Sequence, residues 1–301
     1  MRIASTQIFQ SGLDAMLDQQ TQLYKTQLQL SSGKRFNSPA DDPTAAAQVL
    51  GLSESMAITA QYQANAKTAE KNLNLEEATL TAVGDALQRA RDLAVQGNNA
   101  TYSPAERQAL AQELRQLMDH VLNLANTRDE AGEYIFAGSQ SRQPPFSHDG
   151  MGTFSFGGDQ GQRQIQVGPS RTIPTGDSGF DVFMKVENAD GSGYQDIFTT
   201  LHTLVTDFEA DSPDPDRLTE LDKALDNVLS VRTNIGARLN ALEREEEVNI
   251  AYSLQLETTR SQIQDLDVIQ ASVDLSRQEL VLRSAQQAFV QVQGLSLFDY
   301  L

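Results

Sequence analysis

The sequence predicts a mainly α-helical protein in which long, coiled-coil-like helices from both ends of the chain enclose one small inserted β-rich domain. Apolar residues recur at intervals of seven near both ends. This period is missing between Tyr134 and Tyr194, where Gly residues separate short runs of β-type residues. Helices at the ends and strands in the middle follow from these two patterns.

The first predicted helix carries one apolar stripe. Its apolar residues at intervals of seven are Phe9, Met16, Leu23 and Leu30. We assign Leu13, Leu17 and Leu28 to the same stripe. Such a stripe predicts a helix that packs against partners along one face, so we interpret it as a self-assembly stripe.

The stretch LSSGKRFNSPADDP, residues 30–43, predicts a joint between two helices. Gly33 is the residue type that ends a helix in the left-handed conformation. Asp42 followed by Pro43 is typical of an N-cap followed by the first helical position, and Pro39 lies in the linker between these signals. The acidic residue before Asp42 is interpreted as a solvated carboxylate.

A second helix is expected from Asp42 to about Gln96, and a third follows it. The second helix again has apolar residues seven apart, and those expected in the core of a helical bundle are Leu73, Leu80 and Leu87. Ser103, Pro104 and Glu106 form a capping box with proline in the first turn, which predicts the start of the third helix.

Four runs in the middle of the chain predict strands: EYIFAG, GTFSFGG, RQIQVG and FDVFMKV. Helical periodicity then resumes with Leu221, Val228, Ile235 and Leu242, of which we assign Ile235 and Leu242 to the core bundle. Near the C-terminus, Leu266, Val273 and Leu280 are again seven apart and are assigned to the self-assembly stripe.

These elements predict three domains. Residues 1–42 and 257–301 are expected to form an inner layer of terminal helices, residues 43–138 and 195–256 a helical core domain, and residues 139–194 a β-rich surface insert. Isolated helices are marginal in water, and a two-helix hairpin covers each stripe on one side only. We therefore expect terminal helices that are disordered in the monomer and fold against neighbouring copies in a homo-oligomer.

Composition excludes several classes of partner and site. The formal charge of −18 argues against a nucleic-acid or anionic-membrane partner, because both need a basic surface. The chain has no cysteine, so disulfides, thiolate metal sites and cysteine nucleophiles are excluded. The first residues lack the apolar core of a cleavable signal peptide, and no run approaches the ~20 apolar residues that span a bilayer.

No catalytic, cofactor or metal site is predicted. His120, His148 and His202 lie far apart in the sequence without ligand-spaced partners. The basic pair after Gly33 does not complete a phosphate-binding loop, because Leu28 stands where that pattern requires Gly. The informative feature of this chain is therefore its periodicity.

Several motifs resemble the flagellin family in the same order along the chain. LSSGKRFNSPADDP with the following TAAAQVL resembles its N-terminal signature, LQRARDLAVQGNNATYSPAERQALAQEL from Leu87 its conserved helix-loop-helix, and VRTNIGARLNALE from Val231 its C-terminal return helix. The resemblance covers residues 1–138 and 195–301. The start MRIASTQIFQSGL and the end GLSLFDYL resemble the branch of the family at the hook-filament junction, the third hook-associated proteins, more than filament flagellins.

The resemblance implies a flagellin-like helical core and a tube of subunits in which Gly33, Pro39, Asp42 and Pro43 form the joint between the inner and outer helical layers. Gly236 would then permit close approach of helices in the core bundle. LQRARDLAVQ, residues 87–96, also resembles the flagellin surface that an innate immune receptor reads.

The resemblance also implies partners and a location. The partners would be further copies, an adjacent hook-associated junction protein on the hook side, flagellin on the filament side, and a cytoplasmic export chaperone that covers the C-terminal helix at Leu266, Val273 and Leu280. The protein would be exported to the extracellular flagellum by the flagellar type III apparatus without a cleavable signal peptide.

The leading hypothesis is a non-enzymatic structural adaptor that joins hook to filament by assembling into a short helical ring. The alternative is a filament flagellin, with the same physics and many more copies. A more remote alternative is a secreted enzyme with a catalytic insert, which would need a polar constellation between residues 139 and 194.

Overall fold

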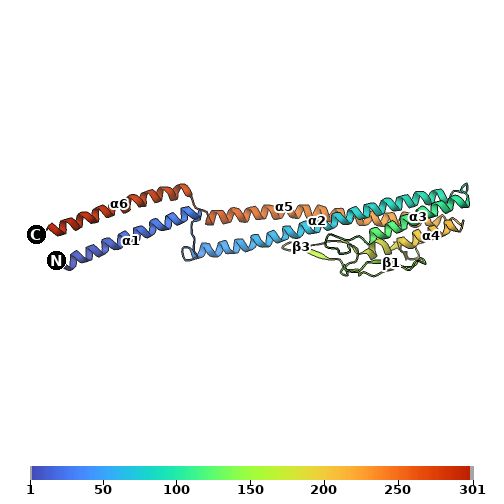
Figure 1. Cartoon of the computed structure of the whole chain (residues 1–301), viewed down its shortest axis with the longest axis horizontal. Helices are drawn as coiled ribbons and strands as arrows, with labels where there is room; N and C mark the ends of the chain where they lie inside the picture. The colour runs from blue at the N-terminus through green and yellow to red at the C-terminus, as the bar shows by residue number, and fades with distance from the viewer. Residues whose placement is uncertain (1, 299–301) are drawn as a thin grey trace. The chain divides into compact units, whose positions relative to one another are not determined.

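The computed structural model describes residues 2–298 and is mainly helical, as the sequence predicts (Figure 1). The α-helices of this range are α1 (Arg2–Ser32), α2 (Pro43–Gly97), α3 (Pro104–Ala125), α4 (Ile197–Glu209), α5 (Asp216–Gln264) and α6 (Val268–Phe298). None of these described helices has the length and apolarity needed to span a membrane.

The chain divides into two compact units. The first unit contains the described residues up to Ile58 and from Ala251 onward, and the second is Thr59–Ile250. The domain boundaries expected from the sequence stay a prediction.

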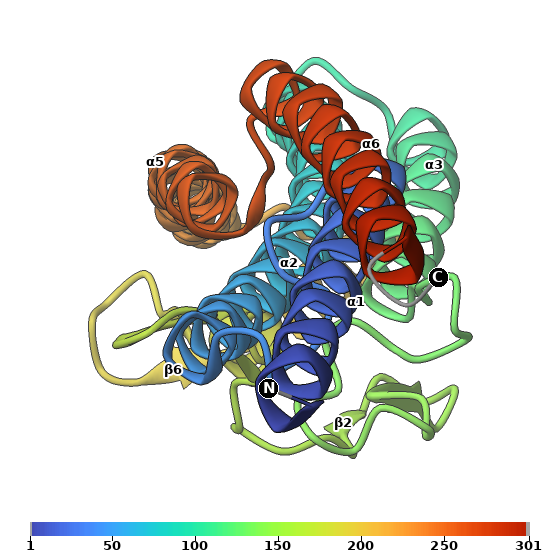
Figure 2. The ribbon, with the colours of Figure 1, turned by 90° about the vertical axis from the view of Figure 1, so that its left-hand side faces the viewer.

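In the first unit, α1 and α6 form an antiparallel pair. The rings of Phe9 and Phe289 lie 4.9 Å apart at one end of the pair. At the other end, the amide of Leu266 donates to the carbonyl of Gly33 over 3.0 Å. The two helices lie side by side in both views (Figure 1 and Figure 2).

The second unit has a closed hydrophobic core. All the leucine and isoleucine residues assigned to the core bundle are buried in it: Leu73, Leu80, Leu87, Ile235 and Leu242. Helix α3 packs against α4, and the capping box expected at Ser103 is present, with the Ser103 amide donating to Glu106 Oε2 over 2.7 Å. The heptad pattern therefore identified the buried face of α2 and α5.

The insert consists of three two-stranded antiparallel sheets. They pair β1 (Phe146–His148) with β2 (Phe154–Phe156), β3 (Gln164–Gly168) with β4 (Arg171–Pro174), and β5 (Val186–Glu187) with β6 (Tyr194–Gln195). The strands expected in GTFSFGG and RQIQVG are present.

Two expected strands are not regular strands. In EYIFAG the residues from Phe136 to Gly138 are all buried, and Gly138 has a φ of 66°, so the chain turns. Most of FDVFMKV forms a short π-helix, η1 (Phe180–Met184). Val182 and Phe183 are consecutive and both fully buried, which the alternation of a strand does not provide.

Phenylalanine rings join the insert to the helices. The ring of Phe146 in β1 lies 5.2 Å from that of Phe183 in η1 and 5.2 Å from that of Phe198 in α4. Phe136 and Phe183 add an edge-to-face contact at 5.1 Å. The insert thus shares one hydrophobic core with α3 and α4.

A buried carboxyl lies where α2, α5 and the insert meet. The amide of Asp177 donates to Glu76 Oε1 over 3.0 Å, and Asp177 pairs with Arg238 of α5. Glu76 Oε2 has no hydrogen-bond partner among the described residues. Burial, together with the nearby Asp177 carboxylate, raises the pKa of Glu76 from 4.5 to about 8, against the opposing effects of the Asp177 amide and Arg238. The carboxyl of Glu77 on the same helix is a further, weaker cause.

This raised pKa predicts a pH-dependent stability. Because the folded pKa of Glu76 exceeds its unfolded value, the folded state binds more protons between about pH 4.5 and about pH 8. The free energy of unfolding should fall as pH rises through this window, by at most about 1.4 kcal/mol per pH unit from this group. Urea titrations of wild type and Glu76→Gln at several pH values test it, since the variant should lose this part of the slope. Glu70→Gln, an exposed change on the same helix, is the control and should keep the wild-type slope; an unchanged slope in Glu76→Gln would contradict the assignment.

The interpretation of Gly236 as a site of close helix approach is wrong within the subunit. Apart from its chain neighbours and the nearby backbone of its own helix, a Cβ atom added there would meet no described atom within 4 Å. Gly97 at the end of α2 is the opposite case, because a Cβ there would overlap the ring of Phe208.

Gly236→Ala should therefore raise the free energy of unfolding by about 1 kcal/mol, the difference in helix propensity. Gly97→Ala should lower it by about 1–3 kcal/mol through overpacking against Phe208. Denaturant melts of both variants check the pair. A loss of stability in Gly236→Ala would show that the glycine is needed inside the subunit.

Candidate self-assembly surfaces

The joint between α1 and α2 is held by main-chain hydrogen bonds. Helix α1 ends at Ser32, and Gly33 follows with a φ of 68°, which favours glycine. Besides the bond from Leu266 to Gly33, the amide of Arg35 donates to the carbonyl of Gln264 over 2.8 Å. The two chain segments that leave α1 and α5 are therefore tied together by the backbone.

Aspartates complete the joint. Asp42 Oδ1 accepts the amide of Ala45 over 3.0 Å, so Asp42 caps α2, which begins at Pro43. Asp41 is more than the solvated carboxylate expected from the sequence, because its Oδ2 accepts the amide of Ser38 over 3.1 Å and its Oδ1 pairs with Lys25 Nζ at 2.9 Å. The bond from Lys25 and those from backbone amides lower the pKa of Asp41.

A shallow apolar pocket of about 240 Å³ lies beside the joint. Phe36, Pro39, Val49 and Leu50 are among its lining residues, and Phe36 is buried. The structure thus places all four predicted joint residues in one turn-rich segment, and their role between layers stays a prediction.

On α1, two apolar faces replace the single predicted stripe. Met16, Leu23 and Leu30 are half-buried and share the heptad phase of Phe9, whose ring contacts Phe289 of α6. This face is the seam of the α1–α6 pair. A second face, which we call the outer α1 stripe, remains 41–67% exposed and consists of Leu13, Leu17, Tyr24 and Leu28.

Assigning Leu13, Leu17 and Leu28 to the predicted stripe was wrong. At 100° per residue their face is centred about 100° around the helix from the seam, and Leu13 is the member nearest to the seam. A strict count of heptad positions would have separated the two faces, because 13, 17, 24 and 28 share no phase with 9, 16, 23 and 30.

On α6, the residues predicted for the self-assembly stripe do not form the seam toward α1. Leu266 precedes the helix, because Asp267 Oδ1 accepts the amides of Ile269 and Gln270 over 3.0 Å each and caps α6. Leu266 is therefore not part of a helical stripe. The seam toward α1 instead follows the heptad phase of the buried or half-buried residues Ala271, Leu275, Gln278, Leu282, Ala285 and Phe289.

Val273 and Leu280 lie on the opposite face of α6 together with Ile269. These three residues, the outer α6 stripe, are 59–80% exposed. Each terminal helix thus buries one apolar face against the other and leaves a second apolar face in solvent.

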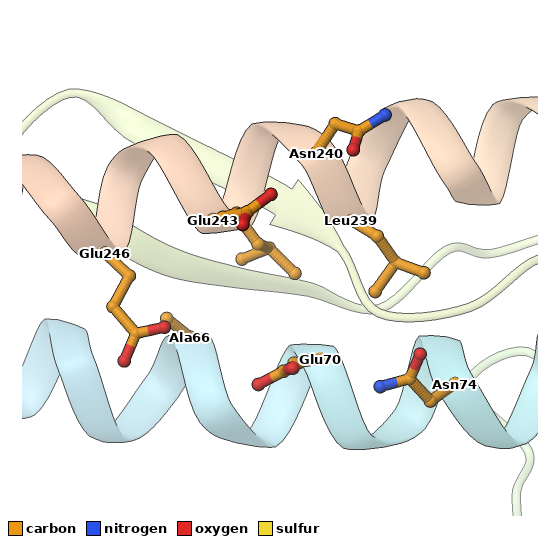
Figure 3. Close-up of a pocket in the computed structure, with 8 residues that line it drawn as sticks. Ala66, Glu70, Asn74, Leu239, Asn240, Glu243 and Glu246 are labelled. Atoms are coloured by element: carbon orange, nitrogen blue, oxygen red, sulfur yellow. The ribbon is translucent and has the colours of Figure 1, made fainter.

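A polar cavity of about 370 Å³ lies between α2 and α5 of the second unit (Figure 3). Glu246 extends from α5 toward Ala66 of α2, with Glu70 and Asn74 on the facing helix. Glu243 is a third carboxylate in the lining. Within residues 2–298, no group of three metal-ligating side chains is arranged to hold an ion. His148 Nδ1 accepts the amide of Gly150 over 3.2 Å, an ordinary turn contact.

Comparison with known proteins decides the family. The model of the bacterial flagellin N-terminal helical region matches residues 4–141. The flagellar hook-associated protein 3 of Escherichia coli strain K12 is 33% identical over 99% of both chains. The chain belongs to the flagellar hook-associated protein 3 family.

Two further comparisons give the fold and a more distant relative of this family member. The crystal structure of flagellar hook associated protein-3 from Legionella pneumophila shares the fold, with a TM-score of 0.67 at 21% identity, covering 70% of this chain and 98% of that one. Flagellin FlaB2 of Treponema pallidum is a more distant relative, 24% identical over 94% of this chain and 95% of its own length. The resemblance found in the sequence motifs is thereby confirmed for this hook-associated protein 3 family member.

The glycine at the joint gives a test of how the register of α1 and α6 is held. Gly33→Ala should cost about 1–2 kcal/mol, because alanine is strained at positive φ. Hydrogen exchange of the Leu266 amide, which donates to Gly33, should become faster. Gly51→Ala in α2, where a Cβ would meet no described atom within 4 Å, is the control and should leave that exchange unchanged. Equal exchange in both variants would show that Gly33 does not maintain the bond.

Proposed function

We propose that this chain is a non-enzymatic structural subunit that assembles with copies of itself and joins the flagellar hook to the filament. The observation that carries the proposal is the pair of exposed apolar stripes on α1 and α6, in a chain that matches a hook-associated protein 3 along its whole length. Exposed apolar patches of this kind mark interaction surfaces in soluble proteins.

The finer parts of the proposal concern partners and location. One end of the assembled ring contacts an adjacent hook-associated protein and the other end contacts flagellin, outside the cell. Before export without a cleavable signal peptide, a cytoplasmic chaperone covers the C-terminal helix. The exposure of Val273 and Leu280 supports this last step, because such a surface would aggregate if left open.

The same proposal includes that the terminal helices complete their packing only when the subunit assembles. In the free subunit the α1–α6 pair covers only one face of each helix, so the terminal segments gain their full apolar burial in the assembly. The joint at residues 33–43 then connects an inner helical layer to the layer built by α2 and α5.

A filament flagellin is the competing function, supported by the family model and by the flagellin relative. Identity to that flagellin is 24%, compared with 33% to the hook-associated protein 3 of E. coli. This difference favours the junction subunit.

Immunogold electron microscopy of whole flagella separates the two functions. The antibody is raised against the insert, where Met151 in the β1–β2 turn is 82% exposed. We expect one band of label at the hook-filament boundary. Label along the whole filament would make the protein a flagellin, and flagella without label would contradict both. Flagella from cells that lack the protein supply the control for antibody specificity.

A further inference from the structure

The outer α1 stripe and the outer α6 stripe have matching spacings. On α1, the intervals from Leu17 to Tyr24 to Leu28 are seven and then four residues. On α6, the intervals from Ile269 to Val273 to Leu280 are four and then seven. In an antiparallel contact, the same axial register therefore aligns Leu17 with Leu280, Tyr24 with Val273 and Leu28 with Ile269.

The axial register that aligns these pairs is nearly the same as the register of the α1–α6 pair within the subunit. There, Phe9 of α1 lies beside Phe289 of α6. Continued along the antiparallel pair at equal rise per residue, this register sets Leu17 within about one residue of the height of Leu280 and Tyr24 within about one residue of Val273. The outer stripes thus match in the register that the joint imposes.

The stripes cannot meet within one subunit. Val273 and Leu280 lie about 180° around α6 from its seam with α1, so they point away from the α1 of their own chain. Any contact between an outer α1 stripe and an outer α6 stripe must join two copies.

Charge along the stripes is complementary. Asp14 and Asp18 are exposed on one side of the outer α1 stripe, about 70° and 110° around the helix from its centre, and Arg277 is exposed about 60° from the centre of the outer α6 stripe. In an antiparallel contact Arg277 lies on the edge that carries these aspartates, about 3 Å along the axis from the level of Asp18. Neither Asp18 nor Arg277 has an ion-pair partner within 4.0 Å among the described residues.

We propose that the outer α1 stripe of one copy docks antiparallel onto the outer α6 stripe of the next copy, in the same axial register as the α1–α6 pair within a subunit. The contact uses different faces of the two copies, so it repeats head to tail and builds a ring or helix rather than a closed dimer. This inference rests on the proposed function and identifies the surfaces through which the subunits assemble.

Disulfide trapping tests the register, because the natural chain has no cysteine. In flagella from cells that carry Tyr24→Cys with Val273→Cys as their only copy, mild oxidation should produce a ladder of linked subunits on non-reducing gels. The matched control, Tyr24→Cys with Leu280→Cys, displaces one thiol by seven residues, about 10 Å, beyond the reach of a disulfide. It should stay at monomer size. All three positions are exposed in the subunit, so the changes spare its core.

The two possible failures are distinguishable in the same samples. Immunogold label at the junction with no ladder, or with a ladder from the displaced pair, would overturn the proposed docking while leaving the junction function intact. Functional flagella without label would overturn both.

A charge exchange adds a second readout. Asp18→Arg should reduce the yield of the ladder, and Arg277→Asp in the same chain should restore it. If the ladder yield stays low in the double variant, Asp18 and Arg277 do not meet.

Discussion

A helix that is apolar on two faces can bury only one of them in a two-helix hairpin, and the terminal part of this chain is built under that constraint. α1 and α6 each turn one face toward the other, where Phe9 meets Phe289. The remaining faces, with Tyr24 on one helix and Val273 on the other, stay in solvent. The free subunit therefore retains apolar surface in solvent, and this is the surface that the proposed self-assembly would cover.

In the second unit, the apolar faces of the helices are buried within the same chain. Leu73, Leu80 and Ile235 are fully buried, and phenylalanines from the insert complete the core against α4. The insert is thus part of the folded body, and the Glu76 carboxyl, whose pKa is raised by burial, lies under its attachment to the helices. The second unit thus buries its apolar residues in a closed core, whereas the first unit leaves the outer α1 stripe and the outer α6 stripe exposed.

The helices and the joint could be predicted because their causes are local. A seven-residue period, a capping aspartate and a glycine at the end of α1 are all read from a few neighbouring residues, and α2 begins where Asp42 and Pro43 predicted. The short strands could not be read as reliably, because the burial of Phe183 depends on tertiary packing against Phe198 and Phe136. The faces of α6 were the least predictable part of the candidate surface. Because α6 has apolar residues on opposite sides, periodicity alone does not show which side meets α1. The seven-residue spacing also included Leu266, which precedes the start of α6 that Asp267 caps.

The loop between β5 and β6 makes the chain accessible to labelling chemistry. Residues 190–192 are exposed, the turn is closed locally by the bond from the Asn188 amide to the Gly193 carbonyl, and Gly191 supplies a positive φ of 70° at its tip. Loop tips of this kind tolerate short insertions. Since the chain has no thiol of its own, one cysteine placed there would be a unique attachment point for a fluorophore or a heavy-atom cluster. Individual subunits could then be counted by the brightness of a single junction in a living cell.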